Sequence, residues 1–546
     1  MYTLLSAIFV RLIPFGDIGH RTNLLSALFG SAAITVLWIF LRRLGVGRIS
    51  AFAATLSFAF GVTFWSQCLM AEVHALNTLL LGLTLLFVFE AARSPSSRTF
   101  AASGLLIGLT VGHRNLNLLF LAPQVAILER ASRTSRAGNH LRLCALGALV
   151  GSAIIYLYLP IATSRHPPVE VGAPTTFSRF LRVVSAQAYR RHLHGPPVAI
   201  ARRLLGTLLG LPANLGVALL AVPFGAWNCR RRSPATLIPC GWTVLTCVGF
   251  AASYNVLDVE SYLIPAYLCL AILAGFGFDT WRVGRWRTAL PVLACGLLLL
   301  NTRSVSLRHI SIARDYGRQL IASAPRQAVI LSFGDTSTHI LDYMQQVEGK
   351  RPDVVVVSAS EVDEWYVEHL SRRYPEIVWP TAREGGAWLT ELIQRAERSR
   401  PVCLTQPVDV GTGQMRLVAK GLLFCRAAAL DARSLEESVA FWKTAIIPSE
   451  DELRHREIHV QMIDFSFALS RFLLAQGLVE IGNITEARAQ LRAVLVATPD
   501  DSERAIVAAM KTIGREAQGA LSLGDRAREA LRLGPSDPRL PVLLRL

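Results

Sequence analysis

The chain has 546 residues, 52% of them hydrophobic, and a mean hydropathy of +0.39, which together exclude a typical soluble globular protein. Its formal charge is +17, yet nearly all of the 56 basic residues are arginines, and many lie in short loops between apolar runs. This distribution argues against a nucleic-acid partner and is typical of loops that obey the positive-inside rule.

Apolar runs recur through the first 300 residues, at lengths near the roughly 20 residues that a helix needs to cross a bilayer. After an apolar opening, MYTLLSAIFVRLIPFG, the sequence predicts ten spans at 22–41, 49–65, 73–89, 100–112, 115–128, 143–161, 204–227, 235–252, 261–278 and 288–301. The short spans 100–112 and 115–128 could also form one broken helix. If these two stretches are counted as two spans, five arginine-bearing loops lie on the same side of the membrane. By the positive-inside rule that side is cytoplasmic. Residues 1–303 are therefore predicted to form a polytopic transmembrane helical bundle.

This topology brings four polar stretches to the outer mouth of the bundle. They are FWSQCLMAEVHALN (64–77), GHRN (112–115), the basic loop 163–203 and YNVLDVESY (254–262). Ionisable groups near lipid are usually functional or paired, so we predict a polar cavity at the outer leaflet. For any one of these residues, an ordinary position at a helix end is the alternative.

The sequence after residue 303 predicts a small α/β domain, residues 304–446. AVILSF (328–333) is typical of a buried strand, a helix follows near 336–348, and RPDVVVVSAS supplies a second strand. A further strand is predicted around 402–404. Cys403 and Cys425 lie in this polar part and could pair if it is exported.

The last region, 447–546, is predicted to be an α-helical tail related to tetratricopeptide repeats (TPR). The spacing of one repeat is met by Leu474, Ala475, Leu478, Gly482, Ala487, Leu491, Val494 and Pro499. The segment through GDRAREALRLGPSDP is a weaker second copy. Fewer than three repeats rarely stand alone, so the tail is expected to pack on the preceding domain or to bind a protein partner.

Several ordered stretches of the chain resemble the signatures of one family. In the apolar part they are RTNLLSALFG, FWSQCLMAEVHALN, GLTVGHRNLNLLFLAP and YNVLDVESYLIPAYL; the α/β part adds a strand-Gly-Asp-helix pattern and EGKRPDV. They are similar to the protein O-mannosyltransferase-like family of multi-spanning membrane proteins, which have a GT-C glycosyltransferase fold. The resemblance covers nearly residues 1–370, so the expected fold is mainly α, a GT-C-like transmembrane bundle followed by the α/β domain and the TPR-like tail.

The resemblance implies a chemistry. Eukaryotic members transfer mannose to proteins, and GT-C enzymes generally take the sugar from a polyprenyl-phosphate donor at the outer leaflet. A phosphate leaving group favours arginine, whose planar N–H donors match its oxygens. Arg114 is the best candidate, followed by Arg190 and Arg191. The residues expected to contact the sugar or acceptor, or to support these arginines, are Glu72, His74, His113, Tyr189, Tyr254, Asp258, Glu260 and Tyr262.

The chain departs from its relatives in two places. Relatives usually begin with a further span and an outer loop containing Asp-Ser-Gly-Glu, whose acidic residue deprotonates the acceptor hydroxyl. This sequence begins after that loop, so the catalytic carboxylate is expected to be absent; either the chain starts at an internal Met or it is truly shortened. Relatives also tend to have Asn-Trp-Gly-Asp-Pro where this chain has EVGAP (170–174), which weakens any sugar contact there.

We therefore expect an integral protein of the bacterial inner membrane, with residues from about 304 onward outside the cytoplasm. As an enzyme it would transfer a sugar, expected to be mannose, from a polyprenyl phosphate to a protein or glycan hydroxyl. No tightly bound cofactor is expected, and no ligand set identifies a metal. The alternative is a non-catalytic membrane-anchored scaffold that acts through its TPR-like tail. A transporter is disfavoured, because no inverted repeat is evident.

Overall fold

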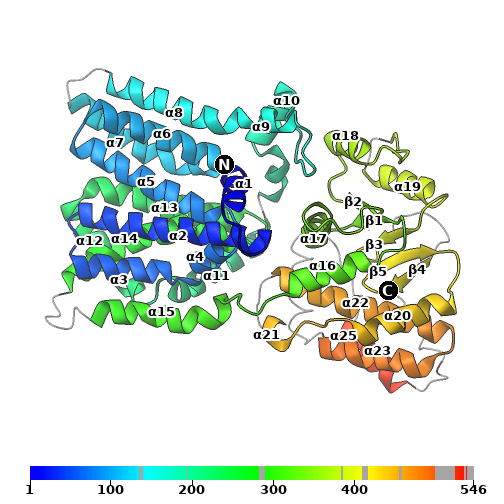
Figure 1. Cartoon of the computed structure of the whole chain (residues 1–546). Helices are drawn as coiled ribbons and strands as arrows, with labels where there is room; N and C mark the ends of the chain where they lie inside the picture. Colours follow the sequence, from blue (N-terminus) through cyan, green and yellow to red (C-terminus); the bar gives the residue numbers. More distant parts are fainter. Residues whose placement is uncertain are drawn as a thin grey trace. The chain divides into compact units, whose positions relative to one another are not determined.

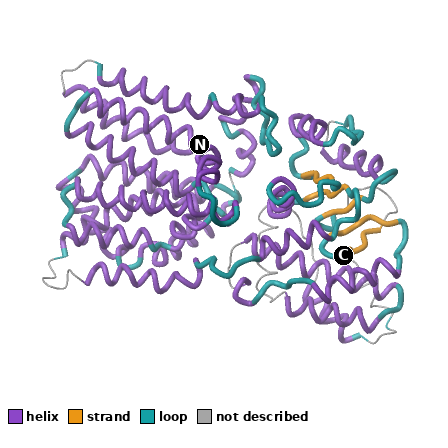
Figure 2. Tube along the Cα trace, viewed as in Figure 1, coloured by secondary structure: helices purple, strands orange, loops and turns teal. Residues whose placement is uncertain are grey.

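The computed structural model describes residues 1–134, 139–193, 195–256, 258–281, 289–382, 385–408, 416–453, 458–497, 523–533 and 537. The chain folds into two compact units (Figure 1). The first comprises Met1–Arg165 and Pro174–Leu307, and the second comprises His166–Ala173 and Arg308–Leu546. The first unit is built from helices, whereas the second combines helices with a sheet (Figure 2).

The first unit contains fifteen α-helices and three short 3-10 helices in its described residues. Its first half consists of α1 (Tyr2–Leu12), α2 (Ile18–Arg43), α3 (Arg48–Ala59), α4 (Val62–Leu69), α5 (His74–Arg93), α6 (Ser97–His113), η1 (Asn115–Phe120), α7 (Leu121–Thr134), α8 (His140–Tyr156) and α9 (Tyr158–Thr163). Its second half consists of α10 (Phe177–Val184), η2 (Gln187–His192), α11 (Pro197–Leu215), α12 (Ala218–Arg232), α13 (Pro234–Ser253), η3 (Val259–Leu263), α14 (Ile264–Thr280) and α15 (Ala289–Val305).

Five helical stretches of this unit are long and apolar enough to cross a membrane on their own. They are Ile18–Arg43, His74–Arg93, His140–Thr163, Pro234–Ser253 and Val259–Thr280. The pairs α3–α4 and α11–α12 are apolar enough only together, and they bend by 64° and 96°. The predicted spans 49–65 and 204–227 thus each fall on a bent pair of helices. Gly216 separates α11 from α12 with φ +52°, a backbone region that favours glycine.

Close helix packing in the first unit depends on glycine. A Cβ atom added to Gly108 of α6 would overlap the carbonyl oxygen of Ala148 in α8, and one added to Gly225 of α12 would overlap that of Leu273 in α14. Figure 1 shows α6 running beside α8. Small residues that let two backbones approach are common between membrane helices. Gly277 in GFGFDTW faces Ala221 in the same way, so packing accounts for that stretch.

The second unit is organised around a five-stranded sheet. Its strands are β1 (Val329–Ser332), β2 (Val355–Ser358), β3 (Val402–Leu404), β4 (Arg416–Lys420) and β5 (Leu423–Ala427), in the order β2-β1-β3-β5-β4. β1 is parallel to β2 and β3, and β5 is antiparallel to β3 and β4. The three strands and the helix predicted from the sequence are confirmed, whereas β4 and β5 were not foreseen.

Helices cover both faces of this sheet. They are α16 (Ile312–Ala322), α17 (Asp335–Gln346), α18 (Glu364–Arg373), α19 (Gly385–Ala396), α20 (Ala432–Thr444), α21 (Glu450–Leu453), α22 (Ile458–Glu480), α23 (Ile484–Ala497) and α25 (Leu523–Arg532). Ile330 of β1 belongs to the core shared with α16, α20 and α22, whereas its neighbour Leu331 belongs to the core shared with α18 and α19. This alternation follows from the two-residue period of a strand.

The predicted tail forms part of the same unit. α22 is also long and apolar enough to cross a membrane, but its Phe467 and Phe472 are fully buried in the core that includes the sheet. The expected repeat positions Leu474 and Leu478 of α22 are buried with Leu491 of α23, in a helical hairpin. The assignment as a TPR stays a prediction, and Pro499 lies outside the described residues.

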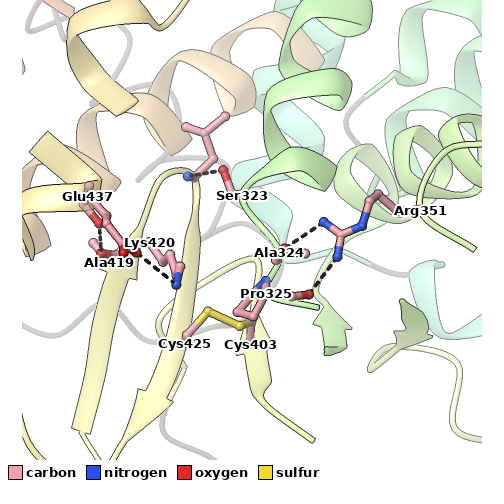
Figure 3. Close-up of a disulfide and its surroundings, with 11 residues drawn as sticks. Ser323, Ala324, Pro325, Arg351, Cys403, Ala419, Lys420, Cys425 and Glu437 are labelled. Atoms are coloured by element: carbon pink, nitrogen blue, oxygen red, sulfur yellow. Dashed lines mark hydrogen bonds and ion pairs between the residues drawn. A yellow bond between two sulfur atoms is a disulfide. The ribbon is translucent and has the colours of Figure 1, made fainter. Parts of the chain in front are cut away.

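A disulfide joins Cys403 of β3 to Cys425 of β5, the pairing that the sequence allowed (Figure 3). Cys403 is fully buried. Disulfides persist in oxidising compartments and are rare in the cytosol.

The EGKRPDV stretch has a structural role in this unit. Arg351 donates hydrogen bonds to the carbonyl oxygens of Ala324 and Pro325, both at 2.8 Å (Figure 3). The same guanidinium pairs with Asp353 at 2.8 Å and holds the pKa of that carboxyl far below its usual range. Asp353 also accepts from the backbone N–H of Gln327. The Arg351–Asp353 pair therefore holds the residues that follow α16 beside the start of β2.

The stretch EVGAP (170–174) begins in a segment of the second unit. The Glu170 side chain is only 3% exposed; it accepts a hydrogen bond from Arg372 of α18 at 3.2 Å and lies 3.8 Å from His369. Ala173 is buried in the core with α18 and α19. This segment therefore packs as part of the α/β fold.

Candidate functional site

Arg114 is held at the junction between α6 and η1. The residue is extended, with φ −149°, so its side chain leaves the helix end. Its Nη1–H donates to Nδ1 of His74 at 2.9 Å, and its guanidinium carbon lies 4.2 Å from the ring centroid of Tyr262. Because the His74 Nδ1 accepts this hydrogen bond, the ring proton is on Nε2. One cation is thus positioned by a hydrogen bond and by an aromatic face.

His113, the residue before Arg114, ties α6 to the start of α5. Its Nε2–H donates to the carbonyl oxygen of Val73 at 3.1 Å. Its Nδ1 is buried and has no hydrogen-bond partner among the described residues. Since Val73 directly precedes His74, this contact and the Arg114–His74 contact fix the two helix ends against each other.

A buried amide network supports this junction. Asn117 Nδ2 donates to Asn77 Oδ1 and to the carbonyl oxygen of Thr110, both at 2.7 Å. The hydroxyl groups of Thr110 and Thr84 are 3.0 Å apart. Sequence reasoning missed this network. A signal was present, because Asn77 and Asn117 each stand three positions after a predicted site residue, His74 and Arg114, inside the same family stretches.

An aromatic cluster continues from Tyr262. The ring centroid of Tyr262 lies 5.3 Å from that of Tyr254 and 5.5 Å from that of Phe250. His192 follows, with its ring centroid 6.3 Å from that of Tyr254, and its carbonyl oxygen accepts from the Asn255 N–H at 2.7 Å. The short helix η2, which carries Tyr189, Arg190 and Arg191, is therefore attached to the aromatic cluster.

The structure thus brings His74, His113, Arg114, Tyr254 and Tyr262 together, and we call these five residues the arginine site. The other predicted residues are exposed around it. Tyr189, Arg190 and Arg191 lie on η2, Glu72 precedes α5, and Asp258 and Glu260 lie at the start of η3. His74, expected at a wet mouth, is 5% exposed and so lies beneath Arg114 rather than at the surface.

No group of three or more His, Cys, Asp or Glu side chains suited to a metal ion occurs within the described ranges. The site offers instead a positioned guanidinium, aromatic faces and further arginines. These groups suit an anionic ligand with an apolar or ring-shaped part.

Two family profiles match the chain. Residues 1–136 match the "Protein O-mannosyl-transferase TMEM260 N-terminal domain", and residues 313–377 match "TMEM260-associated domain 2". The first match includes His74, His113 and Arg114, and the second includes the Arg351–Asp353 pair. Over these two regions the chain is similar to O-mannosyltransferase-like membrane proteins.

Individual proteins agree with this placement. The protein O-mannosyl-transferase TMEM260 of Mus musculus is 26% identical over 420 residues, which cover 70% of this chain and 60% of the mouse protein. The chain thus spans about 60% of the length of that relative. ArnT from Cupriavidus metallidurans in the apo state matches with a TM-score of 0.53 at 15% identity, over 78% of this chain and 87% of ArnT.

A second ArnT structure, bound to undecaprenyl phosphate, matches with a TM-score of 0.51 at 14% identity, over 79% of this chain and 87% of ArnT. At these identities the likeness shows a shared fold. It confirms the predicted polytopic GT-C-like architecture of the chain.

Proposed function

We propose that the chain transfers a sugar from a polyprenyl-phosphate donor to a hydroxyl group of a protein or glycan at the outer face of the membrane. Arg114 binds the donor phosphate. The observation that carries this proposal is the arrangement of Arg114 itself, with one N–H on His74 and one face on Tyr262. The remaining N–H groups of the Arg114 guanidinium can then donate to a phosphate.

Two further arguments support a lipid-linked phosphate as the ligand. The ArnT relative with the same fold binds undecaprenyl phosphate. In addition, Arg190 and Arg191 are exposed on η2, which is attached to Tyr254 through His192. They can approach a phosphate group whose sugar or prenyl part lies along the aromatic cluster.

In the proposed reaction the acceptor hydroxyl oxygen attacks the anomeric carbon of the donor sugar. The bond between that carbon and the phosphate oxygen breaks, and the phosphate leaves on the polyprenyl chain. Arg114 stabilises the negative charge that develops on this leaving group. The hydroxyl proton passes to a base, a role that the resemblance gives to a carboxylate of the first outer loop; we assign it to no described residue.

The proposed sugar is mannose, because the mouse relative is named a protein O-mannosyl-transferase. The Cys403–Cys425 disulfide supports the outer location of the second unit, since such bonds form in oxidising compartments. We further propose the inner membrane of a bacterium as the site of action.

The test is a transfer assay with the full chain in lipid vesicles. Polyprenyl phosphate carrying labelled mannose serves as donor, and the label is counted in protein and in glycan fractions. We expect transfer by the wild type, loss of transfer in Arg114→Gln, and unchanged transfer in Arg165→Gln, which alters an exposed arginine outside the site. Full transfer by Arg114→Gln would remove the phosphate assignment. Release of free polyprenyl phosphate without labelled acceptor would contradict transfer to a hydroxyl.

A further inference from the structure

A cavity of about 250 Å³ lies at the end of α5 opposite His74. It is lined by residues of α5, α7 and α13 and by Phe40 of α2. The apolar side chains that line it are Phe40, Leu85, Val88, Phe89, Ile127 and Pro239. His74 and Arg93 stand at the two ends of α5, about 28 Å apart at 1.5 Å per residue, so this cavity is separate from the arginine site.

A buried amide faces this apolar cavity. Gln124 of α7 lines it, is 1% exposed, and its Oε1 has no hydrogen-bond partner among the described residues. A buried polar atom without a partner costs about 1–3 kcal/mol, and most such atoms in native proteins are satisfied. A leucine would fit these walls without that cost. The amide, with Thr236 the second polar side chain deep in the lining, therefore indicates a ligand that supplies a polar group inside a largely apolar space.

A cation lies at the mouth of the cavity. Arg93, in the last turn of α5, lines the cavity and is exposed. One of its N–H groups donates to the carbonyl oxygen of Arg43 at 3.3 Å. The nearby carboxylate Glu90 pairs with the Arg43 side chain at 2.9 Å. The Arg93 guanidinium can thus offer further N–H groups to an anion, and a phosphate fits its planar fork.

We propose that this cavity binds an anionic glycerophospholipid of the surrounding membrane. One acyl chain fills the apolar space, the phosphate meets Arg93, and the glycerol part reaches the Gln124 amide. The lipid's glycerol backbone carries ester groups and no free hydroxyl, so after a half-turn of the Gln124 amide its Nε2–H donates to an ester carbonyl. The charge at the mouth selects an anionic over a zwitterionic headgroup.

The test measures lipid retention on the full chain by native mass spectrometry in detergent. Phosphatidylglycerol and phosphatidylcholine with the same acyl chains are added separately. The variants are Arg93→Gln and Gln124→Leu, and the control is Arg98→Gln, an exposed arginine in the first turn of α6 that does not line the cavity.

Both lipids present a phosphate to Arg93, but only phosphatidylcholine adds an ammonium group that Arg93 repels. A repulsion of about 1 kcal/mol predicts that phosphatidylglycerol binds the wild type about fivefold more tightly than phosphatidylcholine. Arg93→Gln should abolish this preference, and Gln124→Leu should weaken both lipids while unfolding at the same or a higher temperature without lipid. Arg98→Gln should behave as the wild type.

Equal binding of the two lipids by the wild type would overturn the proposal. Unchanged retention in Arg93→Gln and Gln124→Leu would overturn it as well, because the retained lipid would then bind elsewhere on the chain. Because none of these variants touches Arg114, failure here and failure of sugar transfer are distinguishable.

Discussion

Removing the Cys403–Cys425 bond should destabilise the second unit by a calculable amount. The two cysteines are 22 positions apart, and loop-closure entropy gives such a cross-link about 3.4 kcal/mol at 25 °C. Replacing both residues with alanine also removes buried sulfur atoms, which adds a cavity cost. With a urea m-value of about 1–3 kcal/mol per M, the unfolding midpoint should fall by about 1–3 M.

Pulse proteolysis of the full chain across a urea series measures this midpoint, with an antibody to the second unit as readout. The oxidised wild type should resist the protease to higher urea than both the reduced wild type and the double variant. Cys144→Ala, which removes a free half-buried cysteine of α8, is the matched control and should leave the midpoint unchanged. A reduced wild type with the midpoint of the oxidised protein would refute the reasoning.

Two further predictions concern packing and pH. Gly225→Ala should lower the thermal unfolding temperature in detergent, because overpacking against the Leu273 carbonyl costs about 1–3 kcal/mol. Gly249→Ala is the control and should leave that temperature unchanged, because the added carbon meets open space. Equal unfolding temperatures of the two variants would contradict this reasoning. Burial lowers the pKa of His369 below its usual 6.5, and the positive charge of Arg373 lowers that pKa further. The folded second unit therefore disfavours the protonated imidazole, so it should be most stable above pH 6.5 and lose stability as the pH falls below that value. His369→Gln should flatten this dependence in urea titrations between pH 7 and 5, while the exposed His339→Gln should keep it.

Local patterns predicted much of the fold. The buried strands around Val329 and Val355 were evident from their apolar runs, and the helix between them from its length. The bend at Gly216 was not evident, because the hydropathy is similar on both sides of Gly216. Hydropathy also gives no information on the direction of a helix axis. β4 and β5 were missed because they are short and partly exposed, so their alternation is weak.

Long-range contacts limited the prediction of domains. Glu170 pairs with Arg372, 202 positions away, and no local signal in EVGAP indicates that its segment joins the second unit. Contacts between distant residues were equally hard to predict at the candidate site. Family stretches pointed to Arg114 and His74, but only the structure pairs them and adds the Asn77–Asn117 hydrogen bond.

The central claim is that Arg114 binds the phosphate of a polyprenyl-phosphate donor, and the affinity of the purified full chain for undecaprenyl phosphate tests it most directly. Loss of a charge-assisted contact worth about 1.5–3 kcal/mol predicts that Arg114→Gln binds about 10- to 150-fold more weakly than the wild type. Arg165→Gln should bind as the wild type does. Equal affinity of the wild type and Arg114→Gln would contradict the account.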